Sequence, residues 1–88
     1  MIKDLLKEAR MKEGFKLREV AQQLGVDQAL VSKFESGDRL PTEEQLQKLA
    51  IILSIPFEQL AVDWLRQKIM REIGYNQSMY ALQAVNMV

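Results

Sequence analysis

The sequence predicts an all-α fold, a compact bundle of five helices with a helical extension at the C-terminal end. Apolar residues recur three and four positions apart along most of the chain, which is the spacing of a buried helix face and not of a strand. Residues that end helices interrupt this pattern at Gly14, Gly25, Pro41 and Pro56. The length of 88 residues suits one domain.

Two helices are predicted in the first part of the chain. A helix over residues 2–13 ends at Gly14, and the second has apolar residues at helical offsets: Leu17, Val20, Ala21 and Leu24. Gly25 follows at once, where a helix favours a residue that is free to take a positive φ. Lys16 stands at the N-cap of the second helix and cannot accept an amide proton, so we expect that helix start to be poorly capped.

A third helix, over residues 28–36, is predicted to begin after Asp27. We expect the Asp27 carboxylate to accept hydrogen bonds from the first free amides of this helix. Val31 and Phe34 are its apolar residues, and the opposite face carries Gln28, Ala29, Ser32 and Lys33. That face is polar, and its side chains can both donate and accept hydrogen bonds, which suits the edges of base pairs in a major groove.

The fourth and fifth helices follow two further breaks. Thr42, with Gln45 three residues later, predicts a capping box at the start of the fourth helix. The fifth helix is expected from Phe57 to about Ile73, with an inner stripe of Leu60, Ala61, Trp64, Leu65 and Ile69. We assign residues 1–73 to one domain with an extended fifth helix. Residues 74–88 carry no charged side chain and are expected to be an apolar tail or short helix, either an interface or disordered.

Composition excludes several kinds of site. The chain has neither cysteine nor histidine, which excludes disulfides, thiolate and imidazole metal sites, and Ser-His or Cys-His catalysis. The pair Glu43-Glu44 has no base or metal ligand near it in the sequence, so we expect no enzyme activity, cofactor or metal. No apolar run reaches the roughly 20 residues of a membrane span, and the charged N-terminus is not a signal peptide, so the expected location is the cytoplasm.

The charge balance is unusual for a DNA-binding domain, which is commonly basic. The chain has twelve basic and twelve acidic residues, so its net charge is zero. We therefore expect binding to DNA of arbitrary sequence to be weak.

A family resemblance is carried by the run Glu19-Val20-Ala21-Gln22-Gln23-Leu24-Gly25-Val26-Asp27, followed by Val31-Ser32-Lys33-Phe34-Glu35-Ser36-Gly37. This run resembles the Cro/phage-repressor type of helix-turn-helix domain, a family often called Xre-like, over about residues 2–62. The resemblance implies a repressor-like bundle that binds double-stranded DNA as a sequence-specific transcriptional regulator.

The resemblance also implies roles for individual residues. It places base contacts on Gln28, Ala29, Ser32 and Lys33, and phosphate contacts on Lys16, Arg18 and Arg39. It pairs Arg10 with Glu35 in a structural ion pair. Leu17 departs from the family pattern, where a Gln often contacts phosphate, and Asp38 adds a negative charge near the expected phosphate track.

The C-terminal part is expected to build a homodimer that reads a palindromic operator. Its interface is predicted to contain Trp64, Leu65, Ile69 and Ile73, because they offer more apolar surface than a five-helix monomer needs. In the alternative, Trp64 and Leu65 fold back onto the core of their own chain. An alternative function is an antitoxin-type interaction module, whose C-terminal segment binds a partner protein.

Overall fold

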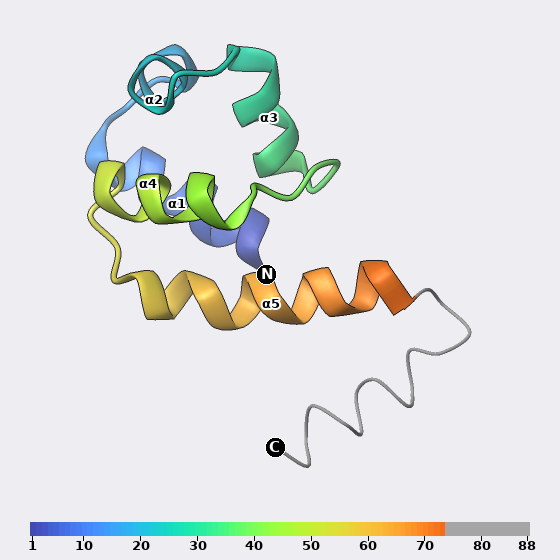
Figure 1. Cartoon of the computed structure of the whole chain (residues 1–88). Coiled ribbons are helices and arrows are strands. Elements are labelled where there is room, and N and C mark those ends of the chain that lie inside the picture. The colour runs from blue at the N-terminus through green and yellow to red at the C-terminus, as the bar shows by residue number, and fades with distance from the viewer. Residues whose placement is uncertain (74–88) are drawn as a thin grey trace.

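The computed structural model describes residues 1–73, which form five helices joined by short turns (Figure 1). The helices are α1 (Ile2–Glu13), α2 (Leu17–Leu24), α3 (Gln28–Ser36), α4 (Glu43–Ile52) and α5 (Phe57–Ile73). The predicted all-α fold is confirmed, and these bounds agree with the helices expected from the sequence. Among residues 1–73, no helix is both long and apolar enough to cross a bilayer. The expectations for residues 74–88 lie outside the described residues.

One apolar core joins all five helices. α3 packs against α1 and α2, α4 packs against α2 and α5, and α5 also contacts α1. The buried side chains are Ile2, Leu6, Val20, Ala21, Leu24, Val31, Phe34, Leu46, Leu49, Ala50, Leu53, Leu60 and Trp64. Full burial of a large aliphatic side chain contributes about 1.5–3 kcal/mol. This core therefore fixes α3 through Val31 and Phe34 on its inner side.

The turn between α2 and α3 is closed by Gly25, which has a φ of 79°. Its amide donates to the carbonyl of Ala21 at 2.8 Å, and the amide of Val26 donates to the same oxygen at 3.0 Å. A side chain at this position would be strained because the left-handed region disfavours residues with a Cβ. This turn sets the direction in which α3 leaves α2.

Three helix starts differ in how their N-cap residues bond. The capping box of α4 is confirmed: Gln45 donates its amide to Thr42 Oγ1 at 3.1 Å, and Thr42 donates its amide to Gln45 Oε1 at 2.9 Å. At α2, the amide of Lys16 donates to Glu19 Oε1 at 2.9 Å, so half of a box forms although lysine cannot accept. Asp27 occupies the N-cap of α3, but its exposed carboxylate accepts no hydrogen bond from the helix, contrary to expectation.

Candidate nucleic-acid interface

The outer face of α3 carries the side chains that were predicted to read bases. Gln28, Ala29, Ser32 and Lys33 are all exposed, whereas Val31 and Phe34 on the inner side are each 2% exposed. Leu30 is partly buried and packs against the core. Figure 1 shows α3 beside α2 at the edge of the bundle, away from α5. The described helices therefore leave this face open to a ligand.

A hollow of about 430 Å³ lies where the start of α2 meets the start of α3. Its lining residues are Arg10, Lys16, Leu17, Arg18 and Gln28. Lys16 and Arg18 are exposed, so their cationic groups are available to a phosphate beside the first residue of the α3 face. Leu17 is partly buried against the core and supplies an apolar wall in place of the polar contact of the resembled family.

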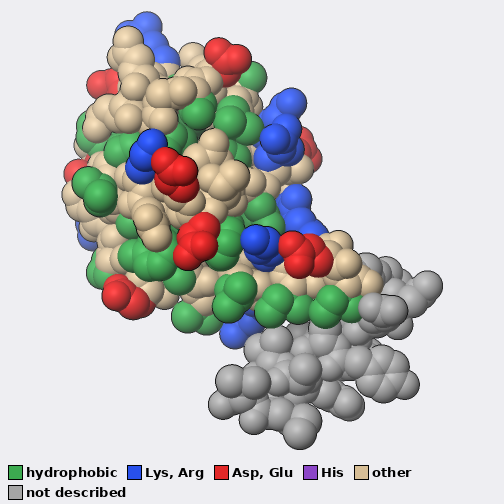
Figure 2. All heavy atoms as spheres, in the orientation of Figure 1, with side chains coloured by type: hydrophobic (Ala, Val, Ile, Leu, Met, Phe, Trp, Pro, Cys, Tyr) green, Lys and Arg blue, Asp and Glu red, His purple; other side chains and the backbone are tan. Residues whose placement is uncertain are grey.

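The loop from Gly37 to Thr42 carries the third predicted phosphate contact. Arg39 is exposed and forms no ion pair with another residue of the described part, so its guanidinium is not held by a carboxylate there. Its backbone amide donates to the carbonyl of Lys33 at 3.3 Å, which ties the loop to the end of α3. Asp38 is exposed in the same loop and lowers the positive potential there. Figure 2 shows basic and acidic side chains close together along this edge of the molecule.

Arg10 and Glu35 form an ion pair that links α1 to the end of α3. Arg10 Nε lies 2.7 Å from Glu35 Oε2 and Nη2 lies 3.1 Å from Oε1, while Nη1 donates to the carbonyl of Phe15 at 2.9 Å. The side chains are only 15% and 10% exposed. The guanidinium therefore connects α1, the α1–α2 turn and α3 at one point.

The prediction that Trp64 belongs to a dimer interface needs correction. It is 7% exposed, and its indole N–H donates to the carbonyl of Pro41 at 2.7 Å. The ammonium of Lys68 lies 5.0 Å from the centre of its ring, within the range of a cation–π contact. Trp64 thus takes the alternative position, on the core of its own chain, because the Pro41 carbonyl offers its N–H a partner there.

The other predicted interface residues lie on the outer side of α5. Leu65 is 52% exposed, and Ile69 lies on the same side of the helix, outside the core, so the place of both in the inner stripe was wrong. Ile69 and Ile73 are partly buried. Val62 is 60% exposed on the same face and was missed, although its offset of three from Leu65 was a usable signal. Figure 2 shows a row of hydrophobic side chains along α5. We call Val62, Leu65, Ile69 and Ile73 the α5 apolar face.

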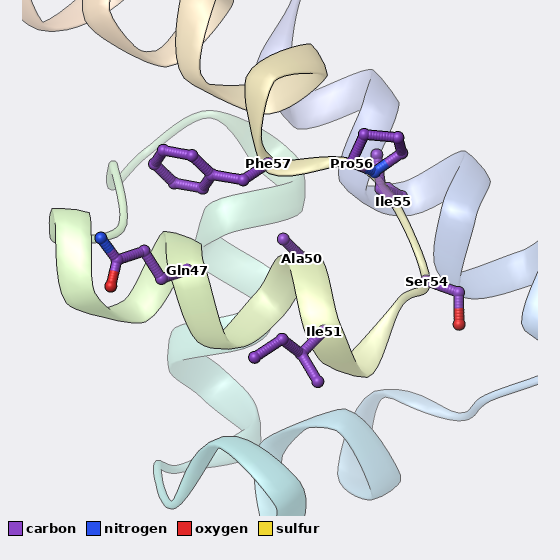
Figure 3. Close-up of a pocket in the computed structure, with 7 residues that line it drawn as sticks. All are labelled: Gln47, Ala50, Ile51, Ser54, Ile55, Pro56 and Phe57. Carbon is purple, nitrogen blue, oxygen red and sulfur yellow. The ribbon is translucent and has the colours of Figure 1, made fainter.

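An apolar hollow of about 620 Å³ lies between α4 and α5, as Figure 3 shows. Its lining residues are Gln47, Ala50, Ile51, Ser54, Ile55, Pro56 and Phe57, none of which is charged. No residue of α3 contributes to this hollow. It is therefore separate from the candidate nucleic-acid interface.

A helix-turn-helix family model matches residues 6–60, which is more than half of the chain. The chain belongs to the helix-turn-helix family. This places it in the broad class of DNA-binding transcriptional regulators, and the match contains both α2 and α3. It ends early in α5, so Trp64 and the C-terminal half of that helix lie beyond the matched segment.

Two solved structures have the same fold. One is the master regulator for biofilm formation SinR in complex with DNA; it is 27% identical, with a TM-score of 0.64, and the match covers 69% of this chain and 98% of that chain. The other is the complex of the SinR protein with the SinI protein, with 20% identity, a TM-score of 0.63, and coverage of 99% and 96%. The second likeness supports the fold alone. No curated protein matches the sequence.

Proposed function

We propose that this protein regulates transcription by binding a specific DNA sequence through α3. The observation that carries the proposal is the exposed α3 face beside the cationic hollow at the start of α2. SinR, which is 27% identical, was solved in complex with DNA, and that supports the same use of the fold here.

Each residue of the α3 face has a chemistry that suits a base edge. The amide of Gln28 can pair with adenine through two hydrogen bonds, and the ammonium of Lys33 can donate to guanine O6 and N7. The methyl of Ala29 suits a thymine methyl, and the hydroxyl of Ser32 can donate or accept. Sequence preference would therefore come mainly from Gln28 and Lys33.

Phosphate contacts would hold α3 in register from two sides. Lys16 and Arg18 lie beside the first residue of α3, and Arg39 lies just beyond its last residue. Contacts of this kind position a protein on the duplex without reading its sequence. Asp27 and Asp38 are exposed at the same two ends and oppose the phosphate charge. The protein should therefore bind arbitrary DNA weakly and depend on its base contacts.

We further propose that the protein is a homodimeric repressor joined through the α5 apolar face. One helix-turn-helix reads only a few base pairs, and two copies on a twofold axis would read half-sites about 34 Å apart or a multiple of it. Occupancy of such a palindrome within a promoter would block transcription. The exposed Val62 and Leu65 support this assembly, since contiguous apolar surface commonly marks an interface.

Selection of bound oligonucleotides from a random pool tests both parts of the proposal. The wild-type protein should enrich one palindromic sequence, whereas the variant Gln28→Ala/Lys33→Ala should lose that preference. A pool without an enriched sequence would overturn specific binding. An enriched single half-site, without a palindrome, would overturn only the dimer.

A second candidate function is an interaction module of the antitoxin type. The composition of residues 74–88 favours it, because a C-terminal segment without a charged side chain suits contact with a partner protein. Isolation of the full chain from its native host, with and without residues 74–88, separates the two functions. A stoichiometric partner that is lost on truncation favours the interaction module, and recovery of the homodimer alone argues against it.

A further inference from the structure

The loop that carries Arg39 is held at both of its ends by side chains of α5. Near the end of the loop, the indole N–H of Trp64 donates to the Pro41 carbonyl at 2.7 Å. At its start, Arg71 Nη2 donates to the Gly37 carbonyl at 2.5 Å. Figure 1 shows the C-terminal end of α5 on the same side of the molecule as this loop. Arg39 thus lies between two carbonyl groups that α5 fixes.

Neither of these donors belongs to the segment that matches the family. The match ends at residue 60, whereas α5 continues to Ile73. The amide of Ile2 also donates to Gln67 Oε1 at 3.3 Å, so the C-terminal half of α5 is attached to α1 as well as to the loop. An arginine on this anchored helix can restrain the loop, because the helix itself is held in place.

The start of the loop at Gly37 is not fixed by its backbone conformation alone. Gly37 has a φ of 87°, a conformation that glycine allows but does not enforce. The side chain of Lys3 runs past it: a Cβ on Gly37 would lie 3.1 Å from Lys3 Cδ. In the middle of the loop, the Arg39 amide donates to the Lys33 carbonyl at 3.3 Å and the Asp38 amide donates to Ser36 Oγ at 3.4 Å, while Leu40 packs against the core. Both of these hydrogen bonds are long and return to the end of α3, so Arg71 supplies the contact that joins the start of the loop to α5.

We propose that Arg71 is a positioning residue for DNA binding, which holds the loop from Gly37 to Pro41 so that Arg39 meets a phosphate. This rests on the proposed DNA-binding function. In this proposal Arg71 acts through the Gly37 carbonyl, which accepts one of the five N–H groups of its guanidinium. The C-terminal half of α5 thereby becomes part of the DNA-binding apparatus without touching DNA. A direct phosphate contact through the other N–H groups is the alternative that the salt dependence below tests.

The matched control for Arg71→Gln is Arg66→Gln. Arg66 lies on the same helix and is 56% exposed, with its guanidinium 3.8 Å from Asp63. Both substitutions remove one positive charge from α5, but only Arg71→Gln removes the contact with Gly37. A difference between the two variants therefore reports the contact and not the net charge.

The first measurement uses the free protein and does not depend on DNA. Amide hydrogen exchange, followed by NMR, should be several-fold faster at Arg39 in Arg71→Gln than in the wild type, and unchanged in Arg66→Gln. Equal exchange in all three proteins would overturn the positioning role. Since this measurement needs no DNA, it distinguishes that outcome from a failure of the proposed function.

The second measurement is binding to the selected operator in a double-mutant cycle with Arg39→Ala. Arg71→Gln alone should weaken binding about three- to tenfold. It should cause no further loss in the Arg39→Ala background, since Arg39 is then absent. A full additional loss in that background, with a further drop of about one in the salt slope, would make Arg71 a direct phosphate ligand and overturn the proposal. An equal loss in Arg66→Gln would overturn it as well.

Discussion

The guanidinium of Arg10 faces the carboxylate of Glu35 through two parallel contacts, Nε–Oε2 at 2.7 Å and Nη2–Oε1 at 3.1 Å. This arrangement fixes direction as well as distance, because both groups are planar. Glu35 lies near the end of α3, so the pair sets the angle of that helix against α1. The exposed α3 face depends on this angle for its approach to a duplex.

Loss of Arg10 should strongly destabilise the fold. In Arg10→Met the aliphatic stem remains, but Glu35 is left as a mostly buried carboxylate without its partner, which should cost about 3 kcal/mol or more of unfolding free energy. Urea denaturation measures the loss. The control is Lys48→Met, which breaks the exposed contact between Lys48 and Glu44 and should change stability by less than about 1 kcal/mol. Similar small losses in both variants would contradict a structural role for the pair.

Gln28→Ala should weaken binding to the selected operator by about 1–3 kcal/mol and leave binding to random DNA nearly unchanged. The reason is that its amide contacts a base edge and not the phosphate chain. Fluorescence anisotropy with the two DNA sequences measures both affinities. Gln47→Ala is the matched control, since Gln47 is exposed on α4 in the hollow of Figure 3. Equal losses on both DNA sequences would mean that Gln28 reads no base.

Arg39→Ala should weaken binding to all sequences and flatten the dependence of log affinity on log salt by about one unit. A phosphate contact releases counterions, so its loss reduces the slope whatever the bases are. Titrations at several salt concentrations give this slope, with Arg66→Ala as the control that removes a charge elsewhere. An unchanged slope in Arg39→Ala would remove it from the phosphate contacts.

Leu65→Glu should convert a dimer to a monomer with little loss of stability. Leu65 is 52% exposed in the single chain, so a charge there is solvated in the monomer but buried in the proposed interface. Sedimentation velocity reports the oligomeric state. Ile51→Glu is the control, because Ile51 is 80% exposed on α4, outside the α5 apolar face. A wild-type monomer, or an undisturbed dimer in Leu65→Glu, would contradict the assignment.

The helix bounds could be predicted because their signals are local. Gly25 and the Thr42–Gln45 pair act within one turn of the chain, and the bonds they predict are present. Asp27 marks the start of α3 correctly, yet its carboxylate does not cap the helix. The position of a cap follows from sequence, whereas the rotamer of an exposed side chain is chosen among states of similar energy.

The environments of Trp64 and Arg71 could not be predicted in the same way. Their partners are backbone carbonyls of Pro41 and Gly37, and no side-chain pattern marks a carbonyl that needs a donor. The apolar stripe predicted for α5 placed both Trp64 and Leu65 on the buried side, whereas in the structure Trp64 is 7% exposed and Leu65 is 52% exposed. Adjacent helix positions point about 100° apart, so only the packing of α5 decides which side faces inward. The base and phosphate contacts remain predictions.

The indole of Trp64 can also report on its surroundings through its fluorescence. It is the only tryptophan in the chain, and it lies where α5 meets the loop before α4. Its intrinsic fluorescence therefore arises from a single site, next to the segment that carries Arg39. The native protein contains an optical probe of that junction, so its response to DNA can be followed without a dye or an engineered label.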